Sequence, residues 1–163
     1  MNSKPVKIPL LEAAKWVLVA LLLVFIIFLL SANRVSQASF ESVRDAVVAS
    51  ADLSPMAEAD SQMLGRLYGL SAGDYEGVCL YAPTTNMGAE ELLVIKLKDR
   101  SQQEAVKAAI EARIQTQMDS FEGYGVTQYE MLENAVIEVQ GNFVLFVAAA
   151  DPAPVRKAFL GAL

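Results

Sequence analysis

A run of seventeen residues without a charged side chain, residues 16–32, constrains this chain more than any other feature. With the adjoining Ala13 and Ala14, the apolar stretch approaches the ~20 residues that cross the core of a bilayer. Inside hydrocarbon every backbone N–H and C=O must be paired within the segment, so a run this apolar is helical if it inserts. The sequence therefore predicts a transmembrane helix over residues 16–32.

The flanks of this run predict its orientation. Lys4, Lys7 and Lys15 precede it and are accompanied by only one acidic residue, Glu12, whereas the basic residues that follow the run have acidic neighbours. The positive-inside rule then places residues 1–15 in the cytoplasm and everything after the run outside the cell membrane. A secreted form is the alternative, because small residues before Ala38 suit cleavage by a signal peptidase near that position.

Composition excludes several classes of function for the part beyond the run. Residues 33–163 carry 10 basic and 18 acidic residues, a net charge of −8, which disfavours nucleic acid as a partner. The chain has no histidine, which removes Ser-His-Asp catalysis and histidine-based zinc sites. Cys79 is the only cysteine and predicts a buried apolar side chain rather than a reactive thiol. No stretch fits a calcium loop or a glycine-rich phosphate loop, so we expect no metal and no cofactor.

Periodicity and turn residues predict the elements of this part. A stalk helix and a linker, broken at Pro55, are expected over residues 33–59, and an extracytoplasmic domain over residues 60–163. Within the domain the pattern predicts helices over 60–68, 102–121, 127–133 and 151–163, and strands over 74–81, 92–98, 135–140 and 143–149. Capping boxes at Ser101–Glu104 and at Thr127–Glu130 open the second and third of these helices.

Two hairpins separated by helices indicate an α+β domain of two layers, in which about four antiparallel strands carry helices packed on the sheet, in the order hairpin-helix-hairpin-helix. The strand over residues 92–98 alternates apolar side chains with Lys96 and Lys98, which predicts one buried face and one wet face there. The strand over residues 143–149 is apolar throughout and is therefore expected at the centre of the sheet.

The loop between the first two strands is the best candidate for a ligand-binding or partner-binding site. It offers Tyr81, Thr84, Thr85 and Asn86, and binding residues concentrate on loops that rigid strands hold in place. Tyr124, in a glycine-flanked turn, is a second candidate. The alternatives are an ordinary hairpin loop for the first group and a helix end with a packed aromatic ring for Tyr124.

Two pairs of neighbouring acids, Asp74 with Glu76 and Glu90 with Glu91, could in principle carry acid–base chemistry. Acids at strand ends are normally solvated, and nothing local indicates that any of these four is buried. No catalytic constellation results, and we expect a protein that is not an enzyme.

The motifs of the domain also resemble a known family. They are the strand over residues 75–81 with the following Pro83-Thr-Thr-Asn86-Met87, the strand over residues 91–98, the helix end at Phe121-Glu-Gly-Tyr124, and Tyr129-x-x-Leu132-x-Asn134-Ala135 before Gly141-Asn142-Phe143. On these residues the chain resembles domain of unknown function 4358, found mainly in Firmicutes. The resemblance implies an exported or membrane-anchored bacterial protein, and it implies no activity. The chain departs from the lipoproteins of that family because it has no cysteine for acylation.

Three functional hypotheses follow. The leading one is a membrane-anchored extracytoplasmic module that binds a protein or a cell-envelope component through the loop at residues 81–87. The second is an accessory subunit of a membrane or envelope complex, assembled through its transmembrane helix. The third and least favoured is a small carboxylate-based hydrolase of envelope polymers that uses Asp74 or Glu76.

Overall fold

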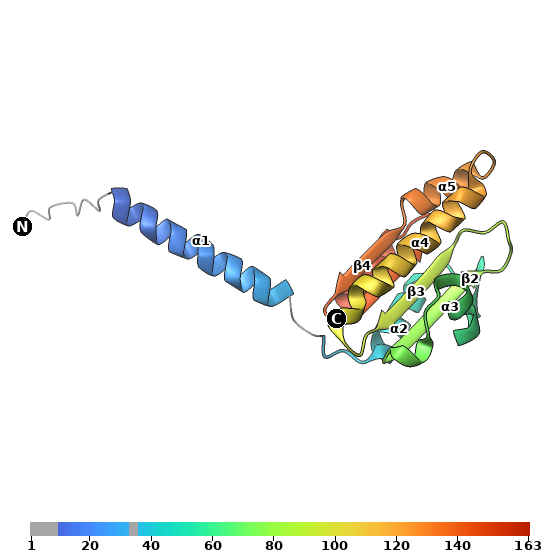
Figure 1. Ribbon diagram of the computed structural model, residues 1–163, viewed down its shortest axis with the longest axis horizontal. Coiled ribbons are helices and arrows are strands. Elements are labelled where there is room, and N and C mark those ends of the chain that lie inside the picture. Colours follow the sequence, from blue (N-terminus) through green and yellow to red (C-terminus); the bar gives the residue numbers. More distant parts are fainter. Residues whose placement is uncertain (1–9, 33–35) are drawn as a thin grey trace, which may run out of the picture. The chain divides into compact units, whose positions relative to one another are not determined.

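The structure, a computed structural model, describes the backbone of residues 10–32 and 36–163 and the side chains of residues 12–26 and 36–163. Its contacts divide the chain into two units, Met1–Arg34 and Val35–Leu163, which are described separately. In the first unit the helix α1, Leu10–Ala32, includes the run for which a transmembrane helix was predicted (Figure 1). Over the described residues, no helix has both the length and the apolar character needed to cross a membrane.

The second unit is an α+β domain built on one antiparallel sheet of five strands in the order β1-β2-β3-β5-β4. The strands are β1 Met56–Ala59, β2 Gly77–Pro83, β3 Glu91–Lys96, β4 Val136–Gln140 and β5 Phe143–Ala148. The predicted α+β class and the two hairpins are confirmed, including the turn at Gly141, whose φ is 60°. The fifth strand, β1, was missed because its four residues follow Pro55 and have no apolar alternation; pairing with β2 makes it a strand.

The central strand of the sheet is β3, which pairs with β2 on one side and with β5 on the other. All six of its residues are buried, including Lys96. The predicted wet face over residues 92–98 is therefore wrong for the strand itself. The physical reason is that helices cover both faces of the sheet, so alternating polarity along β3 does not imply contact with water.

The helices of this unit form two groups, which makes three layers rather than the predicted two. One face carries α3, α4 and α5, whose apolar residues join Leu93, Ile95 and Phe146 in one core (Figure 1). The other face carries α2 and α6, which pack on Leu92, Val94 and Leu145 in a second core. The helices are α2 Phe40–Ser50, α3 Ser61–Tyr68, α4 Gln103–Phe121, α5 Val126–Glu133 and α6 Ala153–Gly161.

Residues 36–59, for which the sequence predicted a stalk helix and a linker, supply α2 and β1 to this unit. Val43 and Val47 of α2 are fully buried in the second core. At the start of β2 the ring of Phe40 lies so close that a Cβ on Gly77 would come within 2.3 Å of it, so only glycine fits there. The backbone N–H of Ser36 also donates to the side chain of Asn142, at 3.1 Å.

Both predicted capping boxes are wrong in detail. Before α4, a short 3₁₀ turn at Arg100–Gln102 carries the box, in which Asp99 accepts from the N–H of Ser101 and Gln102 accepts from the N–H of Asp99. The helix α5 follows Gly125 and has no capping side chain. At α4, Asp99, just outside the expected motif, accepts from the free N–H of Ser101, whereas α5 begins after a glycine that has no side chain to accept. Sequence spacing alone does not distinguish these arrangements from a capping box.

Candidate functional site

Glu91, the first residue of β3, is a carboxylate with no solvent-exposed surface. Three side chains donate to it: the Tyr68 hydroxyl from α3, and Arg113 and Gln117 from α4. The Nη2 of Arg113 lies 2.9 Å from Oε2 of Glu91, and the Nε2 of Gln117 lies 3.2 Å from the same oxygen. We call these four residues the Glu91 cluster.

Burial of a lone carboxylate is strongly unfavourable. Glu91 can therefore be buried in the core only because the other three residues of the Glu91 cluster donate to it. The ion pair with Arg113 compensates the charge, and the hydrogen bonds from Tyr68 and Gln117 satisfy further lone pairs. Burial, together with the charge of Glu91, raises the pKa of Tyr68 well above its usual value. Tyr68 therefore stays protonated and remains a donor at any physiological pH.

The sequence-based expectation that Glu90 and Glu91 are both solvated is wrong for Glu91. Strand periodicity contained one signal that Glu91 is buried. Glu91 lies on the same face of β3 as Leu93 and Ile95, which pack under α3 and α4. The donors come from 22 to 26 residues away in the sequence, on two different helices, and no local pattern connects them.

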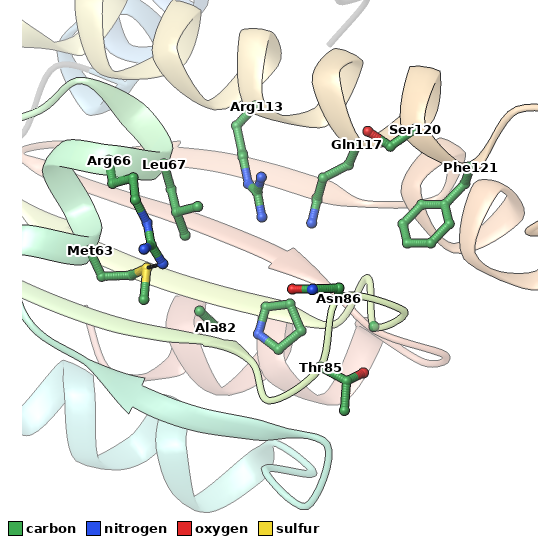
Figure 2. Close-up of a pocket in the computed structure, with 12 residues that line it drawn as sticks. Met63, Arg66, Leu67, Ala82, Thr85, Asn86, Arg113, Gln117, Ser120 and Phe121 are labelled. Atoms are coloured by element: carbon green, nitrogen blue, oxygen red, sulfur yellow. Dashed lines mark hydrogen bonds between the residues drawn. The ribbon is translucent and has the colours of Figure 1, made fainter.

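Beside the Glu91 cluster lies a pocket of about 250 Å³. Its upper wall in Figure 2 is α4, from which Arg113 and Gln117 point toward the loop after β2, while Ser120 lines the same wall. The opposite side is formed by Asn86 and Thr85 of that loop. Close packing shapes this loop, since a Cβ on Gly88 would lie 2.8 Å from the Cβ of Pro83.

The third side of the pocket is α3, with Met63, Arg66 and Leu67 (Figure 2). Arg66 is exposed, and its guanidinium lies against the sulfur of Met63 at 2.7 Å. Among the residues that the structure describes, no carboxylate forms an ion pair with Arg66. Because Arg113 is neutralised by Glu91, Arg66 gives the pocket lining a net positive charge within a domain that is acidic as a whole.

Gln117 has an unsatisfied acceptor. Its residue is only 5% exposed, and within the described part of the chain its Oε1 is the one buried side-chain N or O atom without a hydrogen-bond partner. The amide cannot be turned around, because the carboxylate of Glu91 only accepts and must face the Nε2 donor. The oxygen is therefore buried without a donor, in a side chain that also lines the pocket. An orphaned buried acceptor is unfavourable by about 1–3 kcal/mol.

The residues predicted as a site are only partly brought together. Thr85 and Asn86 line the pocket, but Thr84 lies outside it and bonds the carbonyl of Pro55 instead. Tyr81 packs against the core on the opposite face of the sheet. Tyr124 is 61% exposed, with its ring 6.0 Å from that of Phe121, and does not line the pocket.

The other polar features of the domain are weaker candidates for a functional site. Asp74 and Glu76 are both exposed, and Glu76 is paired with Lys96 at 2.7 Å, so neither occupies a site that excludes water. A larger hollow of about 520 Å³ adjoins α5, but no buried side-chain atom that the structure describes there lacks a partner. Within residues 12–26 and 36–163, no three His, Cys, Asp or Glu side chains gather in a way that could hold a metal ion.

Fold and pocket together define a small α+β domain with a polar, positively lined pocket on one face of its sheet. Residues 49–149 match the family described as Domain of unknown function (DUF4358), and the chain belongs to that family. Neither curated proteins nor solved structures gave a match to this chain.

Proposed function

We propose that this protein is a membrane-anchored extracytoplasmic module that binds a ligand in the pocket formed by α3, α4 and the loop after β2. The observation that carries the binding function is the exposed guanidinium of Arg66, which lines the pocket and pairs with no carboxylate among the described side chains. That the protein is bacterial and exported, as the family resemblance implies, is part of the same proposal.

Membrane anchoring is supported by the charge-free run of residues 16–32 and by the lysines before it. Most of the large apolar side chains described in α1, among them Trp16, Leu18 and Leu21, are more than half exposed. The uncleaved form is favoured over cleavage near Ala38, because Ser36 and Ala38 belong to the domain. Ser36 bonds Asn142 and the carbonyl oxygen of Leu163, and Ala38 packs on the second core.

Ligand binding is supported by the arrangement of rigid and adaptable parts. The Glu91 cluster fixes Arg113 and Gln117 through buried bonds, while Thr85 and Asn86 stand on an exposed loop opposite them. Such preorganisation lowers the entropy lost when a ligand is bound. A cavity of about 250 Å³ suits a small molecule or the end of a longer chain.

The loop offers a matched test of this function. Full-length protein, kept in detergent micelles, is screened by thermal shift and ligand-observed NMR against a diverse set of small polar molecules. We expect the ligands found to be lost by the double variant Thr85→Ala/Asn86→Ala and kept by Thr84→Ala, since Thr84 lies outside the pocket. Binding that is insensitive to both variants, or absent throughout, would contradict the proposal.

An accessory subunit assembled through its membrane helix is the second candidate. The exposed apolar side chains of the described part of α1 favour it, because they are available to another helix as well as to lipid. Crosslinking of the tagged chain in intact cells, followed by mass spectrometry, separates the two functions. Exchange of residues 16–32 for an unrelated membrane helix should abolish subunit assembly but leave pocket-dependent binding unchanged.

A further inference from the structure

A second surface lies where α4 turns into α5, and we propose that it docks a segment of another protein that carries lysine or arginine beside a large apolar side chain. Among the large apolar side chains described in residues 36–163, those more than half exposed are Met87, Tyr124 and Val126, at 57%, 61% and 69%. Exposed apolar side chains that gather in one place mark interaction surfaces, whereas scattered ones are ordinary.

These three side chains lie together although they come from two parts of the chain. Gln128 of α5 donates its Nε2 to the carbonyl of Met87 at 3.2 Å, which ties the loop after β2 to α5. Val126 is the first residue of α5, and Tyr124 lies two residues before it in the preceding turn. We call Met87, Tyr124 and Val126 the Tyr124 patch.

The turn that presents Tyr124 is held in place by the buried Phe121. The backbone N–H groups of Tyr124 and Gly125 both donate to the carbonyl of Phe121, at 3.2 and 2.9 Å. The rings of Phe121 and Tyr124 are 6.0 Å apart, and a Cβ on Gly125 would lie 2.6 Å from Cδ1 of Phe121. A partner therefore meets a preorganised surface, which lowers the entropy lost on binding.

A hollow of about 360 Å³ adjoins the Tyr124 patch and combines apolar with acidic groups. Its apolar lining includes Val126 and Tyr129. Its acidic lining consists of three glutamates, Glu122, Glu130 and Glu133. The hollow shares only Phe121 with the lining of the pocket beside the Glu91 cluster, so the two sites can be altered independently.

The charge of the hollow selects a cationic partner. None of its three glutamates forms an ion pair with a described side chain, and the sequence has no lysine or arginine in residues 114–155. Glu130 and Glu133 lie in the last turn of α5, which carries no basic residue. The negative end of the helix dipole adds to their charge, and both attract a cation. The same charge repels nucleic acid and anionic lipid.

The partner extends beyond the hollow. Met87 and Tyr124 do not line it, so a small amine bound in the hollow would leave both side chains exposed. A polypeptide segment covers them with an apolar side chain while its basic side chains reach the glutamates. Lysine and arginine suit this surface, because their long apolar stems pack on it and keep the charge at the tip.

Crosslinking in intact cells tests this surface on the whole protein. Tyr124→p-benzoylphenylalanine keeps an aromatic ring in the patch, and Leu160→p-benzoylphenylalanine, at an exposed position on α6, is the control. We expect a light-dependent product from position 124 only, with a protein whose crosslinked segment, identified by mass spectrometry, has lysine or arginine next to an apolar residue. Glu130→Gln/Glu133→Gln in the same chain should remove it. No product, or a product with lipid, with a second copy of this chain or with an acidic segment, overturns the proposal.

Defined peptides measure the same preference on the full-length protein in non-ionic micelles, by NMR titration. The probes are acetylated and amidated Lys-Lys-Leu-Lys-Lys, the charge-matched Lys-Lys-Ser-Lys-Lys, the acidic Glu-Glu-Leu-Glu-Glu, and spermine, an amine without an apolar side chain. We expect the first peptide to bind about fivefold more tightly than the serine peptide and spermine, and the acidic peptide not to bind. Equal or tighter binding of spermine would make the hollow a site for small amines and contradict a protein partner.

Variants at exposed positions assign the preference to residues. Val126→Ser should abolish the preference for leucine over serine, and Glu130→Gln/Glu133→Gln should weaken both lysine peptides about fivefold. The controls make the same changes on the α2 and α6 side, in Leu160→Ser and Glu41→Gln/Asp45→Asn, and should leave binding unchanged. Unchanged affinity in both patch variants would refute the proposal. Because the hollow and the pocket are lined by different residues, these variants should keep the pocket's ligands, and failure here leaves the proposed function standing.

Discussion

The two faces of the sheet are built from alternate residues of the same strands, yet they differ in chemistry. The face under α2 and α6 is filled by Val43, Val47, Phe159 and other apolar side chains, with a free cysteine, Cys79, among them. The face under α3 and α4 combines a larger apolar core with a fully buried carboxylate and an open pocket beside it. Apolar packing closes the first face except at the end of β3, where Lys96 pairs with Glu76. The second face keeps several polar groups that need partners.

The difference shows how a small domain separates stability from recognition. A face filled with apolar side chains stabilises through the area and volume it buries, and it offers little to a polar ligand. Buried polar groups contribute less to stability but fix directions, since each donor must point at its acceptor. In this domain Glu91 sets the direction of Arg113 and Gln117, and both of these residues line the pocket.

Removal of Glu91 should break the polar face. In Glu91→Leu, Arg113 loses its only ion-pair partner given by the structure, and the donors of Tyr68 and Gln117 are left unsatisfied. We expect the free energy of unfolding to fall by about 3–5 kcal/mol, measured by urea denaturation. The double variant Glu91→Leu/Arg113→Met should recover much of this loss, because it removes both charges. If the loss of unfolding free energy in the double variant equals the sum of the losses in the two single variants, Glu91 and Arg113 are not energetically coupled.

The apolar face should respond to the opposite change. Val94 is fully buried there, and Val94→Thr keeps its shape while adding a hydroxyl with no partner nearby. We expect a loss of about 1–3 kcal/mol in the same denaturation assay. The matched control is Val78→Thr, at a partly exposed position on the neighbouring strand, which should cost clearly less. A harmless Val94→Thr would show that this face tolerates polar groups as the other one does.

Cys79 makes the apolar face sensitive to alkaline pH. Burial raises the pKa of the Cys79 thiol from 9.0 to about 11, so the folded state retains its proton while the unfolded state loses it. The contribution of this thiol to stability is therefore complete below pH 9 and decreases as the pH rises toward 11. The difference in unfolding free energy between wild type and Cys79→Ala should shrink over this window. Alkylation of the folded protein at pH 8 should also be about 100-fold slower than that of the unfolded chain, and equal rates would contradict burial of the thiol.

The smallest effect is expected at the other charged residue of β3. Lys96 faces the α2 and α6 side, where it lies 5.5 Å from the ring centre of Phe143 and pairs with Glu76, which is half exposed. Because water screens an ion pair with one exposed partner, Glu76→Gln should cost about 0–1 kcal/mol, less still in high salt. A loss as large as that of Glu91→Leu would remove the distinction between the two ends of the strand.

Much of the fold was predictable from local patterns, as α4 and the β4–β5 hairpin show. The apolar stripe of α4 has helical spacing, and Gly141 supplies the positive φ that the hairpin turn requires. The strand β1 was not predictable, since Met56-Ala-Glu-Ala becomes a strand only through its bonds to β2. Of the candidate site, Thr85 and Asn86 were found because loops between strands have a recognisable composition. Arg66, Arg113 and Gln117 were missed because each is an ordinary residue of a helix surface when judged by its neighbours in the chain.

By itself, the sequence determined the periodicities, the turns and the charge-free run of residues 16–32, because these depend on residues a few positions apart. The tertiary structure alone decided that both faces of the sheet are covered, that Glu91 is buried, and that three donors from α3 and α4 meet it. The physical reason is that burial and pairing are properties of groups brought together across the fold. A glutamate at a strand end has the same local signature whether it faces water or an arginine.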